Sequence, residues 1–180
     1  MDRIVVISDT QVPFHDSVAL KNVLDFIHSW QPTLVVHIGD FLDLPQPSRW
    51  TKDTRGEFEG SVKEDAEVGK GLLAYLRKGY DGPVKVIEGN HDARGREYME
   101  KYAPALAEYR AFDLDALLDF EAFGVELVRG FLDFAPNWTM THGHLFSMSQ
   151  LAGRTALLAA KKIGRNVIMG PTHRLSFTAE

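Results

Sequence analysis

The 180-residue sequence contains no cysteine. Disulfide bonds and thiolate metal sites are therefore excluded, and any bound metal must be held by oxygen atoms or imidazole nitrogens. The sequence also lacks an apolar run near the roughly 20 residues that cross a bilayer, and its amino terminus shows no charged region followed by a longer apolar one. We expect a soluble, cytoplasmic protein with no membrane partner.

Positive charge is also scarce. The 20 Lys and Arg residues are outnumbered by 25 Asp and Glu residues, which gives a formal net charge of -5. This balance argues against broad electrostatic binding of duplex nucleic acid, which requires clustered cations. It does not exclude a phosphate-bearing substrate, because bound divalent cations reverse the local charge of a site.

Short apolar runs rich in β-branched residues mark the first half of the chain, at residues 3–8, 33–38 and 83–88. Near-continuous apolar runs of this length are typical of strands buried on both faces. Amphipathic stretches at 17–30 and 59–78 lie between them and predict helices. The order β-α-β-α-β predicts an α/β fold, a layered sheet with right-handed crossovers, and we expect one domain over residues 1–180.

The second half follows a different pattern. Its elements are predicted as short helices over 98–120, a helix near 149–163, and strands at 125–128, 137–141, 166–169 and 174–178. Residues 43–60 form a long polar loop with two prolines and Trp50. Loops of this size in a compact domain are often functional.

Polar side chains follow the predicted strands where each strand ends. Asp9, Asp40 and Asn90 come after the first three strands, and His142 and His173 end later ones. In open α/β sheets this edge is where ligands bind. Two carboxylates, an amide oxygen and two imidazoles suit Mn, Fe, Zn or Ni rather than Ca, and two such ions about 3.5–4 Å apart can clamp a phosphoryl group.

Five motifs together resemble those of the calcineurin-like metallophosphoesterase superfamily. In chain order they are D-T-Q at 9–11, G-D-F-L-D at 39–43, G-N-H-D at 89–92, H-G at 142–143 and G-P-T-H at 170–173. The family patterns are D-x-H, G-D-x-x-D, G-N-H-D/E, H and G-H-x-H. The resemblance covers nearly the whole chain, and the combination is specific where any one motif alone is weak. The intervening text resembles the small bacterial and phage branch.

The resemblance implies a four-layer α/β/β/α sandwich and a two-metal site, with Mn²⁺ expected and Fe, Ni or Zn as alternatives. The implied metal ligands are Asp9, Gln11, Asp40, Asn90, His142 and His173. A metal-bridging hydroxide would attack phosphorus, while His91 protonates the leaving oxygen or stabilises transition-state charge and Asp92 orients the His91 ring. Residues that could contact the ligands or the substrate are Asp43, His144, Arg94 and His15, although each also suits a turn or a solvated surface.

Two positions depart from the family patterns. Gln11 stands in place of a ligand histidine, and Pro171 replaces the first histidine of G-H-x-H. A glutamine oxygen can ligate, but a proline side chain cannot. His144, His37 or water could fill the gap. We expect weaker metal affinity and more dependence on the Mn²⁺ supply.

The leading functional hypothesis is hydrolysis of a small phosphodiester, such as a cyclic nucleotide or an aryl ester, because the chain has little room for a substrate-selecting cap domain. A phosphomonoesterase or a nuclease is the enzymatic alternative. A nuclease needs aromatic and basic residues lining one groove, for which the candidates are Arg49, Trp50, Lys52 and Arg55. A non-catalytic scaffold is a further alternative that Gln11 and Pro171 favour and the retained His91 disfavours. The sequence does not predict the oligomeric state.

Overall fold

Two sheets form the centre of the computed structural model, which describes residues 2–179. The first is parallel, in the order β1-β2-β3-β4, with strands Ile4–Ile7, Leu34–His37, Val84–Ile87 and Val125–Val128. The second has the order β5-β6-β7, with strands Leu132–Ala135, Trp138–Met140 and Asn166–Ile168. Within it β5 is antiparallel and β7 parallel to β6.

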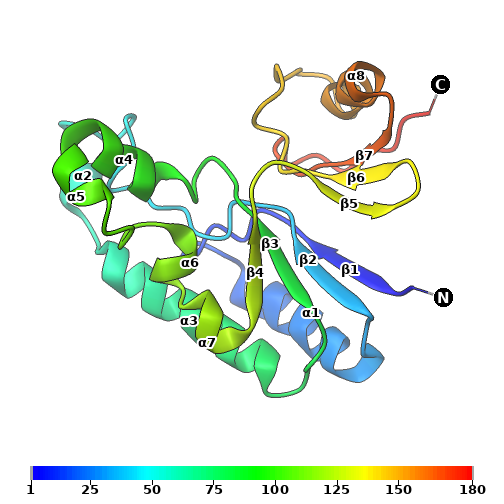
Figure 1. The fold of residues 1–180 in the computed structure, drawn as a ribbon, viewed down its shortest axis with the longest axis horizontal. Helices are drawn as coiled ribbons and strands as arrows, with labels where there is room; N and C mark the ends of the chain where they lie inside the picture. Colours follow the sequence, from blue (N-terminus) through cyan, green and yellow to red (C-terminus); the bar gives the residue numbers. More distant parts are fainter. Residues whose placement is uncertain (1, 180) are drawn as a thin grey trace.

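Two long helices, α1 (Ser17–Trp30) and α3 (Val62–Arg77), cover one face of the parallel sheet (Figure 1). Asp16 begins α1 by accepting hydrogen bonds from the amides of Val18 and Ala19, which satisfies donors that the first turn leaves free. The shorter helices are α2 (Arg55–Phe58), α4 (Arg94–Tyr102), α5 (Pro104–Ala107), α6 (Leu114–Leu117) and α7 (Phe120–Phe123). Within the described residues, no helix is long and apolar enough to cross a membrane.

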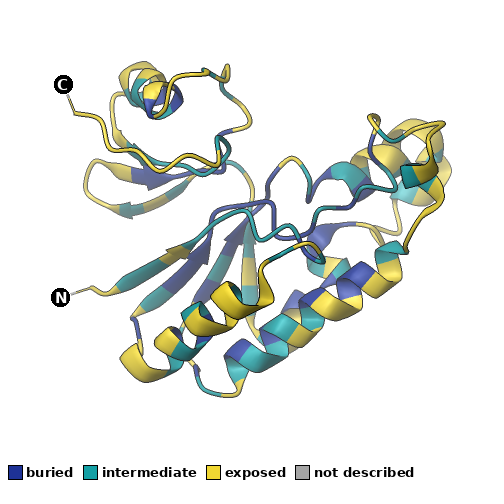
Figure 2. Ribbon diagram, turned by 180° about the vertical axis from the view of Figure 1, so that it is seen from behind, coloured by how far each residue is buried: buried dark blue, intermediate teal, exposed yellow. Residues whose placement is uncertain are grey.

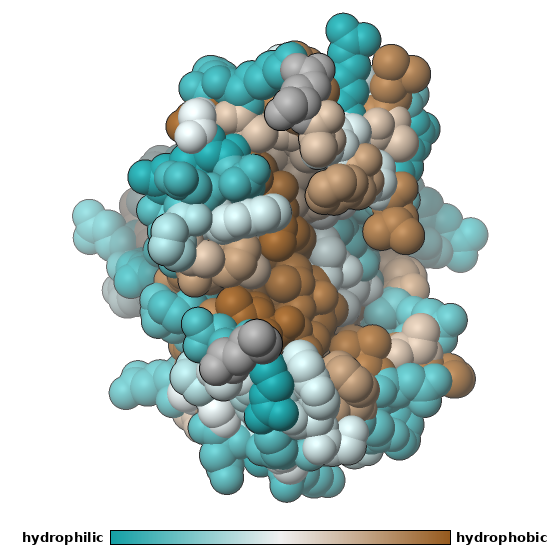
Figure 3. Space-filling model, turned by 90° about the vertical axis from the view of Figure 1, so that its right-hand side faces the viewer, coloured by the Kyte–Doolittle hydropathy of each residue, from teal (hydrophilic) through white to brown (hydrophobic). Residues whose placement is uncertain are grey.

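The other face of the parallel sheet packs on the second sheet. Val36, Ile38 and Ile87 meet Met140 in a buried cluster between the two sheets. Figure 2 shows the buried strands of the parallel sheet, and Figure 3 shows apolar residues gathered in the hollow between the two parts of the molecule. Helix α8 (Arg154–Ile163) contacts β7, which makes it the fourth layer. The α/β/β/α order that the sequence resemblance implied is confirmed.

The second half differs from its sequence prediction in four places. Strand β5 was not predicted, α4 begins at Arg94 rather than at residue 98, and α8 begins at Arg154 rather than near residue 149. Residues 174–178 are not a strand, and within the described chain they pair with no other strand. Leu175 and Phe177 are 104% and 87% exposed. A β-like pattern of side chains does not suffice for a strand without a partner for its backbone groups.

His37, at the end of β2, is buried, with 4% of its surface exposed. Its Nε2 lies 3.0 Å from the Thr10 hydroxyl, which itself donates to the Phe41 carbonyl, so His37 donates to Thr10. Its Nδ1 accepts from the Gly39 amide at 3.3 Å. Burial lowers the pKa of His37 to about 3. The ring is therefore neutral in the folded protein at neutral pH.

This burial predicts a stability change with pH. The unfolded ring has its ordinary pKa of 6.5, so as the pH falls below 6.5 protonation favours the unfolded chain until the folded ring also titrates near pH 3. The free energy of unfolding should fall by up to about 1.4 kcal/mol per pH unit across that window. Urea unfolding in the presence of EDTA at a series of pH values measures the free energy of unfolding. We expect this free energy to fall more steeply with decreasing pH in the wild type than in a His37→Gln variant. Parallel profiles for the two proteins would contradict the assignment.

Candidate metal centre

Ligand-bearing residues from five distant segments meet at one edge of the sheets. Asp9, Asp40 and Asn90 follow β1, β2 and β3, whose carboxyl ends share an edge because the strands are parallel. His142 and His173 follow β6 and β7. One ligand atom each from Asp9, Asp40 and His142 lies within 4.8 Å of the others. Three of the predicted ligands thus form a compact cluster.

The His142 ring is held so that one nitrogen faces oxygen atoms. Its Nδ1 donates to the Ile38 carbonyl at 3.1 Å, which leaves Nε2 3.1 Å from Asn90 Oδ1 and 3.3 Å from Asp40 Oδ2. Burial lowers the pKa of His142, but the hydrogen bond and charge of Asp40 outweigh burial and raise the pKa above its usual value. Nε2 and the two oxygens can share this space only with a proton or a cation between them. A backbone partner on the other ring nitrogen is the usual arrangement of a metal-ligating histidine.

The carboxylate of Asp9 also fits a cation. Its Oδ2 accepts from the Ser8 hydroxyl, whereas Oδ1 is buried without a hydrogen-bond partner among residues 2–179. His173 Nε2 lies 3.0 Å from Oδ1 but without hydrogen-bond geometry, so we take the contact as two ligand atoms side by side. Burial raises the pKa of Asp9. An unpaired buried carboxylate oxygen is costly unless a ligand satisfies it, and the donors present suit a divalent ion.

The backbone at the cluster is strained. Asp9, Gln11, Asp40 and His173 have φ values of 53°, 47°, 55° and 49°. Such left-handed conformations cost about 1–3 kcal/mol each in non-glycine residues and concentrate at functional sites. The Gln11 amide donates to the Asp40 carbonyl at 2.9 Å, which couples two of these turns. Gly89 admits the close approach, since a Cβ there would lie 2.2 Å from Asp40 Oδ1.

His91 lies beside the cluster with its ring fixed by Asp43. Its Nδ1 donates to Asp43 Oδ1 at 2.7 Å, and its backbone amide donates to Asp40 Oδ1 at 2.9 Å. Nε2 is 3.8 Å from Asp40 Oδ2, so it faces the cluster. Arg94 contacts both Asp43 and His91. Its Nη1 donates to the Asp43 carbonyl at 2.7 Å, and its Nη2 lies 2.9 Å from His91 Nε2.

Asp92 does not orient the His91 ring, and that expectation is wrong. The Asp92 carboxylate is fully buried and accepts from the amides of Leu42 and Gly89, both at 2.9 Å. Burial and then the charge of Asp40 raise the pKa of Asp92 to about 7. Consecutive residues point in different directions in this turn, so Asp92 ties together the loops that follow β2 and β3 while Asp43 reaches the ring.

Gln11 and Pro171 stand where the family has ligand histidines. His37 does not replace either one, because both of its ring nitrogens already make hydrogen bonds. The His144 ring lies 5.5 Å from that of His142 between centroids. His144 is exposed as a residue, but partial desolvation of its ring, followed by the charge of His142, lowers its pKa. Pro171 packs against Gly143, and a Cβ at Gly143 would lie 2.8 Å from the Pro171 Cγ. His15 is half-buried, and its Nδ1 has no hydrogen-bond partner in the described chain.

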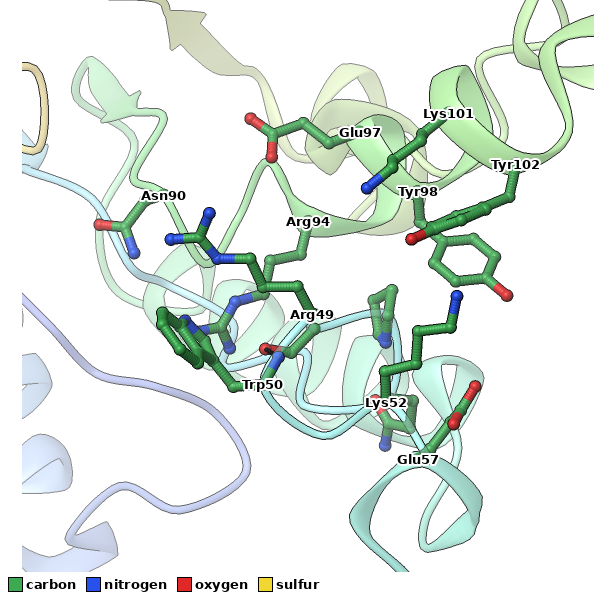
Figure 4. A pocket seen from close by; sticks show the side chains of 13 residues that line it. Arg49, Trp50, Lys52, Glu57, Asn90, Arg94, Glu97, Tyr98, Lys101 and Tyr102 are labelled. Atoms are coloured by element: carbon green, nitrogen blue, oxygen red, sulfur yellow. Dashed lines mark hydrogen bonds between the residues drawn. The ribbon is translucent and has the colours of Figure 1, made fainter. Parts of the chain in front are cut away.

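A cavity of about 370 Å³ adjoins the cluster at Asn90 and Arg94 (Figure 4). Three nuclease candidates line it, namely Arg49, Trp50 and Lys52, whereas Arg55 pairs with Glu59 instead. The sequence prediction missed a second wall, which α4 supplies through Tyr98, Lys101 and Tyr102. Their i, i+3, i+4 spacing indicates a shared helix face. Only the tertiary structure places that face opposite the loop.

Comparisons with known proteins identify a family and several similar chains. The family profile described as calcineurin-like phosphoesterase matches residues 2–168. The gene 54 proteins of Mycobacterium phages D29 and L5 are 51% and 50% identical over 176 residues, which cover 96% of this chain and 69% of each relative. A solved structure, the nuclease MPE of Pseudomonas putida, is 17% identical with a TM-score of 0.39; the match covers 78% of this chain and 53% of that one, so the chain spans about half its length.

The family match spans nearly the whole chain, and within it the strand ends carry the aspartates and the histidine that gather at one edge. The chain therefore belongs to the calcineurin-like phosphoesterase family, a family of metal-dependent phosphoester hydrolases.

Proposed function

We propose that the chain hydrolyses phosphodiesters. The observation that carries the proposal is the open access to the cluster at two of its residues. The cavity of about 370 Å³ opens at Asn90, and the side chain of His173, which contacts Asp9, is 54% exposed. A diester carries an organic group on each side of phosphorus, whereas a monoester carries only one. The site thus offers room for both groups of a diester.

The proposed metal ligands are Asp9, Gln11, Asp40, Asn90, His142 and His173. This mixture of carboxylate, amide and imidazole donors suits two Mn²⁺ ions, with Fe, Ni or Zn as alternatives. Bound ions would neutralise the phosphoryl oxygens and make water at the site more acidic.

His91 then acts from beside the cluster. Asp43 accepts from its Nδ1, which fixes the ring so that Nε2 faces the cluster, where a proton on Nε2 would be directed at a phosphoryl or leaving oxygen. The Arg94 guanidinium lies 2.9 Å from His91 Nε2, and it can instead donate a hydrogen bond to a phosphate oxygen of the substrate. A protein that served only as a scaffold would gain nothing from this oriented pair.

Metal-stripped protein assayed on bis-p-nitrophenyl phosphate and p-nitrophenyl phosphate, with and without Mn²⁺, tests the proposal. We expect hydrolysis only with added metal, and a higher kcat/KM for the diester. Preference for the monoester would replace the proposal with a phosphomonoesterase. A folded protein that binds Mn²⁺ but hydrolyses neither ester would indicate a scaffold.

A further inference from the structure

The cavity beside the metal centre has a chemical character that the hydrolysis of a small ester does not require. It lies between loop residues 46–52 and α4, and we call it the α4 groove. Asn90 stands at one end and Tyr98 and Tyr102 at the other (Figure 4). Because Asn90 Oδ1 is 3.1 Å from His142 Nε2, the groove leads directly to the cluster.

Positive charge gathers in the α4 groove although the chain as a whole carries -5. Its lining has four cations, Arg49, Lys52, Arg94 and Lys101, against the two carboxylates Glu57 and Glu97. Clustered cations on an acidic protein indicate attraction of an anion to that place rather than a general affinity for polyanions. More than one cation along the groove suits a ligand with more than one phosphate.

Aromatic rings alternate with these cations. Trp50 is 75% exposed, and the Arg49 guanidinium lies 4.6 Å from its ring centroid. The amines of Lys52 and Lys101 lie 4.3 and 5.0 Å from the Tyr102 centroid. Tyr98 packs on Tyr102 with centroids 4.8 Å apart. Large exposed rings beside cations, next to a phosphoesterase centre, form a platform for planar bases with their phosphates close by.

We propose that the α4 groove binds single-stranded nucleic acid, with unpaired bases stacked on Trp50 and the tyrosines and one phosphodiester directed to the metal centre. The inference rests on the proposed phosphodiesterase function and names its substrate class. A duplex keeps its bases stacked inside and offers only phosphates, so the exposed rings favour a single strand. The volume of the groove, about 370 Å³, fits a small number of nucleotide groups rather than a long duplex.

Fluorescence anisotropy of a labelled oligothymidylate at low salt with EDTA tests binding without cleavage. Wild-type protein should bind, and Trp50→Ala should weaken the affinity about 5- to 150-fold, the effect of losing one stacked base. The matched control is Trp30→Ala, which removes the exposed tryptophan of α1 that Arg3 covers at 5.3 Å. It should bind as the wild type does. Trp50→Phe should retain most of the affinity because it keeps a ring.

Three outcomes would overturn the inference: no binding by the wild type, equal losses in Trp50→Ala and Trp30→Ala, or equal affinity for a duplex of the same length. Displacement by a cyclic mononucleotide at the same nucleotide concentration would also overturn it, in favour of a mononucleotide substrate. Hydrolysis of bis-p-nitrophenyl phosphate by the wild type tests the proposed function separately. An active enzyme that binds no oligonucleotide would retain that function and lose only this substrate class.

Discussion

Replacing Asp40 with asparagine should abolish metal-dependent hydrolysis while the protein still folds. Asp40 is buried and contributes to three contacts at once, since Oδ1 accepts from the His91 amide and Oδ2 faces the imidazoles of His142 and His91. Asparagine keeps an oxygen for the amide but removes the negative charge at the centre of the cluster. Loss of an outer partner of a metal ligand already costs about 10–100-fold in affinity, so losing this carboxylate should cost more than about 100-fold.

Titration calorimetry with Mn²⁺ and the metal-induced rise in melting temperature measure this loss independently of activity. Asp133→Asn is a suitable control, because Asp133 is an exposed carboxylate on β5 that pairs with Arg165. The control should bind Mn²⁺ and hydrolyse bis-p-nitrophenyl phosphate as the wild type does. Unchanged Mn²⁺ affinity in Asp40→Asn would mean that Asp40 is not a ligand, and the proposed metal centre would have to be placed elsewhere.

Replacing His91 with alanine should lower kcat by about 10²–10⁴-fold, the usual contribution of a positioned acid or base. Mn²⁺ affinity should change little, because the contact of His91 with Asp40 Oδ1 is made by the backbone amide, which alanine retains. Asp43→Ala should lower kcat less, by about 10–100-fold, since it leaves the ring in place but unoriented. The remote His28→Gln, whose ring contacts the Leu76 carbonyl, is the control.

The same variants can separate the two roles open to His91. If His91 protonates the leaving oxygen, the loss in kcat should be larger for diphenyl phosphate than for bis-p-nitrophenyl phosphate, because p-nitrophenolate departs without a proton more easily. If His91 stabilises charge on the phosphoryl oxygens, the two losses should be equal. A His91→Ala enzyme with wild-type turnover on both esters would exclude His91 from either role.

The sequence determined the layered fold and the sheet edge at which the candidate metal centre lies. Its apolar runs end in Asp9, Asp40 and Asn90, and parallel strands must bring their carboxyl ends to one edge. The motif spacing then identified the family without any contact being known. These features are local in the chain or follow from strand direction, so a pattern of residue types is enough to predict them.

Only the tertiary structure decided which carboxylate accepts the hydrogen bond from the His91 ring. Asp92 adjoins His91 in sequence, yet it turns inward to the amides of Leu42 and Gly89, and the ring meets Asp43 from 48 residues away. Left-handed backbone at Asp40 and Leu44 flanks the segment that carries Asp43. Such conformations are held by surrounding packing, so no local residue pattern predicts them.

The α4 groove was decided in the same way. The sequence placed Arg49, Trp50 and Lys52 in a polar loop, but it did not predict that the aromatic face of α4, about fifty residues later, lines the same groove. Neither segment forms a binding surface alone. Side chains that converge from separate segments owe their distances to how the whole core packs, and that information is spread over the chain rather than contained in either motif.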